Sequence, residues 1–400
     1  MYHLFTATAA LFLSVALLMV AGGLLGSLVG LRAAHEGFPV EVAGLMMSAF
    51  YAGLILGTLR CGALINRVGH IRAFGAFCGV NAAAVLAFPL LVDPWFWLAL
   101  RVLIGFNMAG MYMVVESWLN SSAEGPTRGT LLAAYMAVSY LAMGSGQFML
   151  TLGDLGGDTL FSLAGMLTAL ALVPLAVTRA THPAPVPDSR FGFRELYRLS
   201  PLAVIGCALA GVQVGALFGL GPIFAQQLGL ALDEIAVFMG ALVLSGLLLQ
   251  LPLGRLSDHV DRRWVIVGAA LVACLAGLLL LPVTAHYSFT SFTVSGAEVR
   301  VLWEQNPAPL LLVAALCGGT IATLYPLCVA YANDQVSAQD MVPASGGLVL
   351  AYGSGALLGP VGGALAMKLL GASGLFAFTA AAGALTALVA LWRLRRGAPT

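Results

Sequence analysis

Charged residues are scarce in this sequence. Of its 400 residues only 9% are Asp, Glu, Lys or Arg, whereas 60% are hydrophobic. A soluble domain carries about 25% charged residues, so this composition excludes a soluble globular protein. The net charge of +1 gives no sign of a nucleic-acid partner, and we expect none.

Clusters of metal-binding or nucleophilic residues are also missing from the sequence. The six cysteines all fall inside or at the ends of apolar runs, and none belongs to a CxxC pair. None of the six histidines lies near the middle of an apolar run, so a membrane-embedded enzyme would lack a nucleophile–base pair or a ligand set at depth. We therefore expect no catalytic residue, no metal and no cofactor.

What the sequence has in abundance is long apolar runs. Each run could cross a hydrocarbon core of about 30 Å at 1.5 Å per residue. The predicted spans are residues 5–31, 42–64, 74–92, 96–119, 130–153, 159–178, 201–228, 234–254, 264–286, 308–332, 346–370 and 372–392. The first run lacks a basic flank and is interpreted as a retained helix. The predicted fold class is an all-α membrane protein with twelve transmembrane helices.

The distribution of arginine predicts the orientation of these helices. If the N-terminus is cytoplasmic, only Arg32, Arg101, Arg300 and Lys368 lie away from the cytoplasmic side. Cytoplasmic loops carry an excess of Lys and Arg. We therefore expect a multi-pass, monomeric protein of the cytoplasmic membrane, with both termini in the cytoplasm.

One polar, proline-rich and basic stretch divides the chain into two halves. It predicts an N-terminal six-helix bundle at residues 1–178, a cytoplasmic linker at 179–200 and a C-terminal six-helix bundle at 201–400. The halves also match one another in order. "YMVVESWLN" (112–120) pairs with "YPLCVAYAN" (325–333), for example, and Tyr135 pairs with Tyr352. A parallel repeat of this kind is typical of transporters whose bundles rock about a central site.

Several motifs resemble those of one family. "GALINRVGHIR" (62–72) and "GRLSDHVDRR" (254–263) resemble the cytoplasmic loop motif of the major facilitator superfamily. "RVLIGFNMAG" (101–110) resembles its helix-four motif, and "GGLVLAYGSGALLGPVGG" (346–363) resembles its glycine–proline motif, here in helix eleven instead of five. The phrases "ESWLN" and "YPLCVAYAND" are further similar to an uncharacterised bacterial branch, the YcaD-type transporters. The resemblance implies two pseudo-symmetric six-helix bundles.

The resemblance also implies a cytoplasmic gate. A carboxylate and an arginine that pair in one conformation only could stabilise that conformation by about 1–3 kcal/mol, and Glu116 stands where the family places an acidic partner. In the first loop motif, Asn66 and His70 replace the family's Asp and Arg. The residues assigned to the gate are Arg60, Asn66, Arg67, His70, Arg72, Glu116, Asp258, Arg262, Arg263 and Asp334.

Glu116 has three interpretations at this point. It could be a latch that pairs with His70, Arg72 or Arg60. It could be a fixed ion pair between the second and fourth helices, with no part in motion. It could also carry a proton. The sequence leaves these alternatives open.

Arg101 begins a helical stripe that continues through Gly105, Met108 and Tyr112. An arginine at this depth faces a partner or a watery cavity, because leaving it in lipid costs about 3 kcal/mol or more. The resemblance implies a role in substrate binding or coupling. The alternative is a side chain that snorkels toward Asp93 or Asp154 at the outer edge.

Polar residues in the central helices predict the lining of a substrate site. The residues assigned to substrate binding or coupling are Arg101, Asn107, Tyr112, Tyr135, Gln213, Tyr325 and Tyr352. Small residues let membrane helices approach closely. Those assigned to helix packing are Gly22, Gly26, Gly30, Gly211, Gly215, Gly219, Gly355, Gly359 and Pro360.

The predicted function is secondary active transport of a small neutral or anionic organic solute by alternating access. The expected partners are that solute, protons and the lipid bilayer. Two alternatives stay open: a carrier for facilitated diffusion, and a transporter-like receptor that binds a solute without moving it. Proton-driven transport is favoured over facilitated diffusion, although no Asp or Glu lies at the middle of any predicted span.

Overall fold

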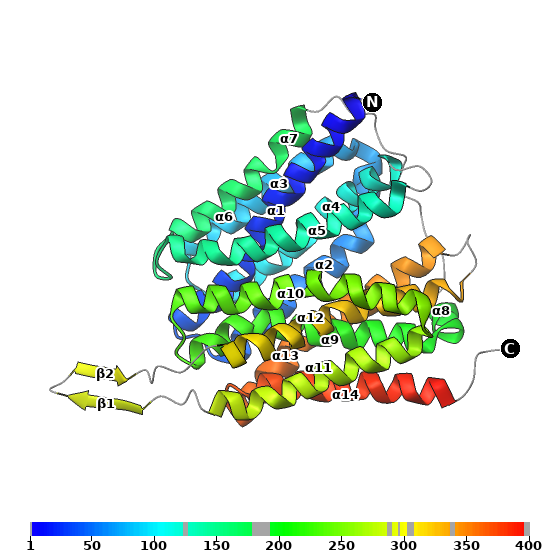
Figure 1. The fold of residues 1–400 in the computed structure, drawn as a ribbon. Helices are drawn as coiled ribbons and strands as arrows, with labels where there is room; N and C mark the ends of the chain where they lie inside the picture. The colour runs from blue at the N-terminus through cyan, green and yellow to red at the C-terminus, as the bar shows by residue number, and fades with distance from the viewer. Residues whose placement is uncertain are drawn as a thin grey trace.

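A computed structural model describes residues 2–122, 127–177, 193–285, 290–294, 297–301, 308–336 and 341–395. These residues form long helices in two bundles that lie against each other, with a small β-hairpin at one end (Figure 1). The all-α class predicted from the sequence is confirmed, apart from this hairpin. We call the end of the molecule with the hairpin the hairpin end, and the end with both chain termini the terminus end.

The first bundle is built from the N-terminal half of the chain. Its long helices are α1 (Tyr2–His35), α2 (Val40–Val68), α3 (His70–Ala87), α4 (Pro94–Ser122) and α5 (Thr127–Phe148). Its shorter elements are the 3-10 turns η1 (Phe88–Leu90) and η2 (Met149–Leu152), and the helices α6 (Thr159–Leu170) and α7 (Leu172–Val177). The predicted span 159–178 is therefore not one continuous helix. It breaks at Ala171, close to Pro174, whose ring and missing N–H disfavour helix continuation.

The second bundle is built from the C-terminal half. Its elements are α8 (Phe193–Leu199), α9 (Pro201–Gln227), α10 (Leu232–His259), α11 (Arg262–Ala285), α12 (Ala308–Asn333), α13 (Met341–Leu370) and α14 (Gly374–Arg395). Residues 179–192 of the predicted linker lie outside the described residues. The rest of the linker is α8, which packs against α9 and α13, with Leu196 under Gly347.

Within the described residues, eleven helical segments are long and apolar enough to cross a membrane, counting α6 and α7 as one. Of the twelve predicted spans, the one at residues 130–153, which corresponds to α5, is not among these eleven. It is the least apolar of the long helices and carries Ser139, Tyr140, Ser145 and Gln147. It nevertheless packs lengthwise against α1 in its own bundle and α10 in the other.

The stretch between the predicted spans 264–286 and 308–332 contains a β-hairpin that the sequence analysis did not predict. β1 (Thr290–Val294) and β2 (Ala297–Val301) pair antiparallel, with Thr290 opposite Val301. Threonine and valine favour such strands because branched side chains pack well on a pleated surface.

Glycines set the closest helix contacts in the second bundle. A Cβ added at Gly211 of α9 would lie 2.0 Å from the carbonyl oxygen of Tyr352 in α13. One added at Gly355 of α13 would lie 1.8 Å from the carbonyl oxygen of Ala208 in α9. Gly215 and Gly359 extend this contact. These four glycines pack helices, as their small size predicts.

In the first bundle the packing glycines differ from those predicted. Gly26 has no atom within 4 Å of the place where a Cβ would lie, and Gly22 has only the end of Met108 at 3.9 Å. The close contact between α1 and α5 instead uses Gly23 and Gly146, whose added Cβ atoms would meet backbone at 2.2 and 2.3 Å. Gly26 therefore makes no close helix contact among the described residues, because the closest contact of α1 with α5 lies on the neighbouring face of the helix.

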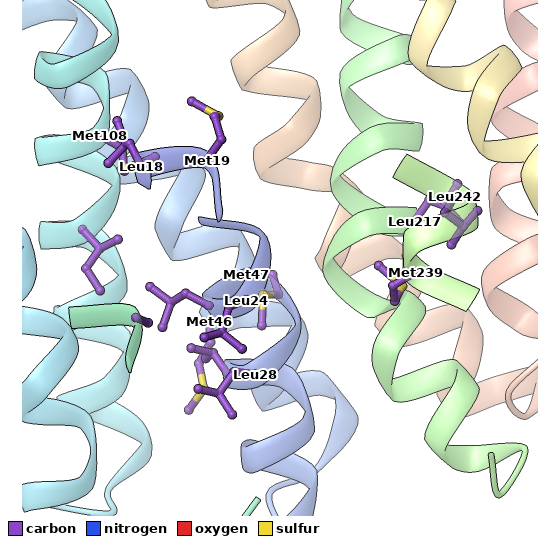
Figure 2. Close-up of a cluster of buried hydrophobic side chains, with 14 of the residues drawn as sticks. Leu18, Met19, Leu24, Leu28, Met46, Met47, Met108, Leu217, Met239 and Leu242 are labelled. Atoms are coloured by element: carbon purple, nitrogen blue, oxygen red, sulfur yellow. The ribbon is translucent and has the colours of Figure 1, made fainter. Parts of the chain in front are cut away.

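The hydrophobic core shows how the bundles are joined. One cluster of buried side chains continues from the first bundle into the hairpin-end part of the second. Figure 2 shows Met46 and Met47 of α2 and Leu217 of α9 within this cluster. A separate cluster, which includes Leu202 and Ala387, fills the terminus-end part of the second bundle. The two bundles therefore share one core at the hairpin end only.

Candidate functional site

Four tyrosines predicted from the repeat come together between the bundles. They are Tyr112 of α4, Tyr135 of α5, Tyr325 of α12 and Tyr352 of α13, and we call them the tyrosine cluster. The rings of Tyr325 and Tyr352 lie 4.7 Å apart between centroids, tilted by 54°. Tyr352 lies within electrostatic range of Tyr112 across the interface, and Tyr135 within range of Tyr112 in its own bundle.

Two further tyrosines extend the cluster. Tyr51 of α2 and Tyr140 of α5 both lie within electrostatic range of Tyr352. The sequence reading missed them, because neither has a tyrosine at the matching position of the other half. The ring of Tyr140 also lies 2.8 Å from where a Cβ on Gly246 of α10 would be. Tyrosine side chains from five helices, α2, α4, α5, α12 and α13, thus meet in one region.

Arg101 lies within electrostatic range of Tyr51 and is only 5% exposed. Its Nε donates to the carbonyl oxygen of Met46 at 3.3 Å, and one terminal nitrogen contacts the Met47 sulfur at 3.4 Å. Its guanidinium carbon stands 4.7 Å above the centre of the Phe50 ring, which gives a cation–π contact. Three of the five N–H groups on this side chain have no bond to any described residue.

The snorkelling interpretation of Arg101 named Asp93 and Asp154 as partners. Neither carboxylate pairs with it. One Asp93 oxygen accepts the backbone N–H of Phe96 at 2.8 Å, at the start of α4. No carboxylate among the described residues forms an ion pair with Arg101. The positive charge is therefore buried against neutral groups.

The two amide side chains predicted for the site hydrogen-bond within their own helices. Asn107 donates to the Leu103 carbonyl at 2.8 Å, and Gln213 donates to the Leu209 carbonyl at 3.3 Å. Gln213 is fully buried, and its Oε1 has no partner in the described part of the chain. An unpaired acceptor at depth is costly, so Oε1 is available to a donor on a ligand.

Glu116 lies one helical turn beyond Tyr112, toward the terminus end of α4. Its side chain is exposed and forms no hydrogen bond or ion pair with any other described residue. It lies within electrostatic range of Tyr112, Tyr135 and, in the other bundle, Tyr325. The ion pairs expected with His70, Arg72 or Arg60 are absent from this part of the structure.

The first loop motif holds its helices by other contacts. The His70 ring Nε2 lies 3.0 Å from the Ser117 hydroxyl, which joins α3 to α4. The side chains of Arg60, Arg67 and Arg72 are exposed. Asn66, where the family motif has aspartate, is uncharged and offers no carboxylate to these arginines.

The second loop motif does form an ion-pair cluster. Arg262 at the start of α11 contacts Asp334 at 2.6 Å, just beyond α12, and Asp258 of α10 at 3.2 Å. It also donates to the Ser257 hydroxyl at 2.9 Å. The cluster lines a cavity of about 380 Å³ at the terminus end. Three helices of the second bundle are tied together here.

Arg263 pairs with its neighbour in the same loop. Its terminal nitrogen lies 2.7 Å from the Asp261 carboxylate. The side-chain hydrogen bonds from Arg263 hold the pKa of Asp261 below its ordinary value. Arg262 and Arg263 therefore both act within the second bundle in this conformation.

A set of contacts between the bundles closes the hairpin end, and we call it the hairpin-end seal. Lys368, the one lysine in the sequence, pairs with Glu41 and joins α13 to α2. A Cβ on Gly44 of α2 would lie 2.6 Å from the Ala364 Cβ and 2.8 Å from the Pro360 carbonyl oxygen. The seal therefore depends on a glycine.

Two predicted packing glycines also belong to the seal. A Cβ on Gly219 of α9 would lie 3.2 Å from Met47 of α2, and one on Gly30 of α1 would lie 3.4 Å from Ile223 of α9. Gly30 and Gly219 therefore pack one bundle against the other.

Among the described residues, the close contacts between the bundles become fewer toward the terminus end. Halfway along, Ile55 of α2 packs on Gly353 of α13. Nearer the terminus end of α10, Gly254 has no described atom within 4 Å of where its Cβ would lie. Figure 1 shows the bundles diverging in this direction. The tyrosine cluster and Glu116 thus lie on the side where the bundles separate.

The sequence profile of the Major Facilitator Superfamily matches residues 11–303. The chain belongs to the major facilitator superfamily. It is therefore a multi-pass membrane transporter that acts on a small molecule.

Individual relatives agree with this assignment. The chain is 31% identical over 357 residues to the uncharacterised MFS-type transporter YcaD of Escherichia fergusonii, covering 88% of this chain and 86% of that protein. The YcaD protein of Salmonella typhi matches at the same identity and coverage.

Solved structures of other transporters share the fold. A bacterial homologue of the human lysosomal transporter Spinster, solved in an inward-facing and occupied conformation, matches with a TM-score of 0.77. It is 13% identical, over 97% of this chain and 96% of that one. The nucleoside transporter NupG matches with a TM-score of 0.72 at 12% identity, over 100% of both chains.

Proposed function

We propose that this protein is a secondary active transporter for a small neutral or anionic organic solute, working by alternating access across the cytoplasmic membrane. The observation that carries the proposal is Arg101. It is a buried cation within electrostatic range of Tyr51, with no carboxylate partner among the described residues. A buried charge needs a partner, and an anionic group on a ligand would supply it.

In this proposal the terminus end faces the cytoplasm and the hairpin end faces outward. The excess of arginine at the terminus end supports this orientation. The bundles pack together at the hairpin end and separate at the other, so the conformation is inward-open. Residues 1–178 and 201–400 then form the two moving bundles, and α5 provides the twelfth span.

The charge of Arg101 selects against cations. Two like charges 4 Å apart repel by about 4 kcal/mol at an effective dielectric of 20. A neutral or anionic solute avoids this repulsion. Its apolar or aromatic body fits the tyrosine cluster, while Asn107 and the unpaired Oε1 of Gln213 provide polar contacts.

The loop residues form the cytoplasmic gate in this proposal. Arg262, Asp258 and Asp334 hold the ends of α10, α11 and α12 as one unit, so this part of the second bundle moves as a body. Proton coupling is favoured over facilitated diffusion. Because no carboxylate lies at mid-span in the sequence, the proton must bind near a helix end or travel on the solute.

The test begins with a screen of purified protein for solutes that raise its thermal stability. Uptake of the best ligand into proteoliposomes is then measured with and without a pH gradient. Arg101→Ala should abolish uptake, and Arg101→Lys should weaken it, because lysine keeps the charge but loses the planar fork. Arg395→Ala, at the exposed end of α14, is the matched control and should transport normally. Normal uptake by Arg101→Ala, or a quaternary ammonium as the best substrate, would refute the proposal.

A further inference from the structure

The basic segment between the two bundles has no part in the site described above. Residues 179–200 carry four arginines against one aspartate and one glutamate. Residues 179–192 lie outside the described part of the chain. The remainder forms α8, at the terminus end of the second bundle (Figure 1). Two of the four arginines, Arg194 and Arg198, lie in this short helix.

One side chain fixes α8 to the second bundle. Leu196 is fully buried, and a Cβ on Gly347 of α13 would lie 2.7 Å from its Cδ2. α8 also packs against α9, which begins at Pro201, with one residue between the two helices. Because α9 is long and apolar enough to cross a membrane, α8 lies at the membrane boundary.

The two arginines of α8 lie on the face opposite this contact. At about 100° per residue, Arg194 and Arg198 each lie about 160° from Leu196 and about 40° from each other. They are four positions apart, so their Cβ atoms are neighbours on the helix surface, about 5–6 Å apart. Both side chains are exposed. α8 thus presents two adjacent guanidinium groups on the face turned away from the protein.

Two side chains with apolar surface flank the buried side of α8. Tyr197 is 46% exposed and lies about 100° from Leu196 in one direction. Leu199 is 39% exposed and lies about 60° from Leu196 in the other. Tyrosine is enriched at membrane–water interfaces, because its ring is apolar and its hydroxyl is polar. Apolar flanks beside a basic face are typical of helices that lie in the plane of the interface.

The charges of Arg194 and Arg198 are not compensated by the protein. No carboxylate of the described residues pairs with either of them. The acidic residue of α8, Glu195, has a side chain outside the described part. The next acidic residue in the sequence is Asp233, at the hairpin end of the molecule. In a membrane, the negative groups closest to the basic face of α8 are lipid phosphates.

We propose that α8 binds the phosphate of an anionic phospholipid between Arg194 and Arg198, with the apolar part of the lipid against Tyr197 and Leu199. A guanidinium group offers a planar fork that matches two phosphate oxygens. In the proposed orientation this lipid belongs to the cytoplasmic leaflet, whose negative surface attracts basic segments beside a span. Because Leu196 holds α8 to the second bundle, the bound lipid attaches the cytoplasmic end of that bundle to the membrane.

The experiment titrates short-chain lipids against the full-length protein in a non-ionic detergent. Dihexanoyl phosphatidylglycerol and dihexanoyl phosphatidylcholine share a phosphate, but the second carries a quaternary ammonium that two arginines would repel. Inorganic phosphate and glycerol phosphate test for a soluble anion, and polyglutamate tests for an acidic protein partner. Binding is measured from the melting temperature and from the number of lipids retained in native mass spectrometry.

Phosphatidylglycerol should raise the wild-type melting temperature at a lower concentration than phosphatidylcholine. A basic residue near an anionic surface increases affinity about fivefold, so Arg194→Gln with Arg198→Gln should weaken phosphatidylglycerol binding roughly 5- to 25-fold. This double variant should also retain one lipid fewer. Arg194→Lys with Arg198→Lys keeps the charge but loses the planar forks, so it should lose less. The matched control is Arg393→Gln with Arg395→Gln, which removes the same charge from the last turn of α14 and should bind like the wild type.

Four results would overturn the inference, each obtained on variants shown to be folded by size-exclusion chromatography. The first is wild-type affinity for phosphatidylglycerol in the α8 double variant. The second is an equal loss in the α14 control, which would indicate attraction to the whole basic end. The third is displacement of the lipid by inorganic phosphate or glycerol phosphate at equal concentration, which would indicate a site for a soluble anion. The fourth is stabilisation by polyglutamate but not by phosphatidylglycerol, which would assign this face to an acidic protein. None of these results bears on transport, which the Arg101 variants test separately.

Discussion

Replacing one glycine should open the hairpin-end seal. Gly44 of α2 faces α13, and a methyl group there would lie 2.6 Å from the Ala364 Cβ and 2.8 Å from the Pro360 carbonyl oxygen. Neither neighbour is a flexible side chain that could turn aside, so relief requires the bundles to move apart. We therefore expect Gly44→Ala to destabilise the inward-open conformation and to leave the outward-open one unaffected.

The size of the effect follows from the cost of overpacking. One extra methyl in a well-packed contact costs about 1–3 kcal/mol, which corresponds to a population shift of roughly 5- to 150-fold. The average distance between spin labels at Leu90 and Leu370 should lengthen, because a larger fraction of the molecules would leave the inward-open conformation. Ala364→Gly, introduced together with Gly44→Ala, should restore part of the original distribution, because it removes one of the two clashes.

Gly79→Ala is the matched control. Gly79 lies in α3, and no atom stands within 4 Å of the place where its Cβ would lie. This variant should give the wild-type distances. A folded Gly44→Ala protein with an unchanged outer distance would show that the hairpin end is not a moving seal, and the inward-open assignment would lose its main support.

Three other predictions test the seal, the topology and the loop cluster. Lys368→Gln should shift the outer distance in the same direction as Gly44→Ala but far less, because exposed ion pairs contribute little to stability. A cysteine at Ser295 should react with an impermeant thiol reagent on intact, wall-stripped cells, and one at Ser189 should not; both positions lie outside the described residues, and reversed labelling would contradict the orientation. Arg262→Gln should lower the free energy of unfolding by about 1 kcal/mol or less, and so lower the melting temperature slightly, since its partner Asp334 is 54% exposed. An unchanged melting temperature would show that the loop cluster adds nothing to stability.

The fold could be predicted from the sequence because the length of an apolar run and the charge of a loop are properties of short, continuous segments. Each span needed only a run of about 20 apolar residues, and the boundaries mostly agree within a few residues. The exceptions have local causes. α6 and α7 separate close to Pro174, and the hairpin of β1 and β2 lies between two predicted spans, where no secondary structure was predicted.

The repeat was also informative about the site. It selected Tyr112, Tyr135, Tyr325 and Tyr352 by their matching positions, and all four lie in one cluster. It could not select Tyr51, because matching finds only residues that have a counterpart. Spacing also failed for the glycines of α1, where Gly23 packs helices and Gly26 does not, since neighbouring faces of a glycine-rich helix look alike in sequence.

Contacts between the bundles could not be predicted from the sequence at all. The pair of Lys368 and Glu41 joins residues more than three hundred positions apart, and nothing in the local pattern relates them. The same holds for the unpaired state of Glu116. Its motif position suggested an ion pair, but the neighbouring loop carries Asn66 and His70 in place of the usual charges, and His70 contacts Ser117 instead.

The two ends of the molecule differ in the kind of interaction available to hold them closed. At the hairpin end, backbone and small side chains such as Gly44, Ala364 and Gly219 fit closely, with one exposed ion pair. Tight packing of this kind responds to volume and hardly to pH or salt. At the terminus end the groups that would meet include Glu116 and many arginines, whose interactions depend on protonation and ionic strength. Substitutions that add volume should therefore act mainly on the outer seal, and substitutions that change charge should act mainly on the cytoplasmic gate.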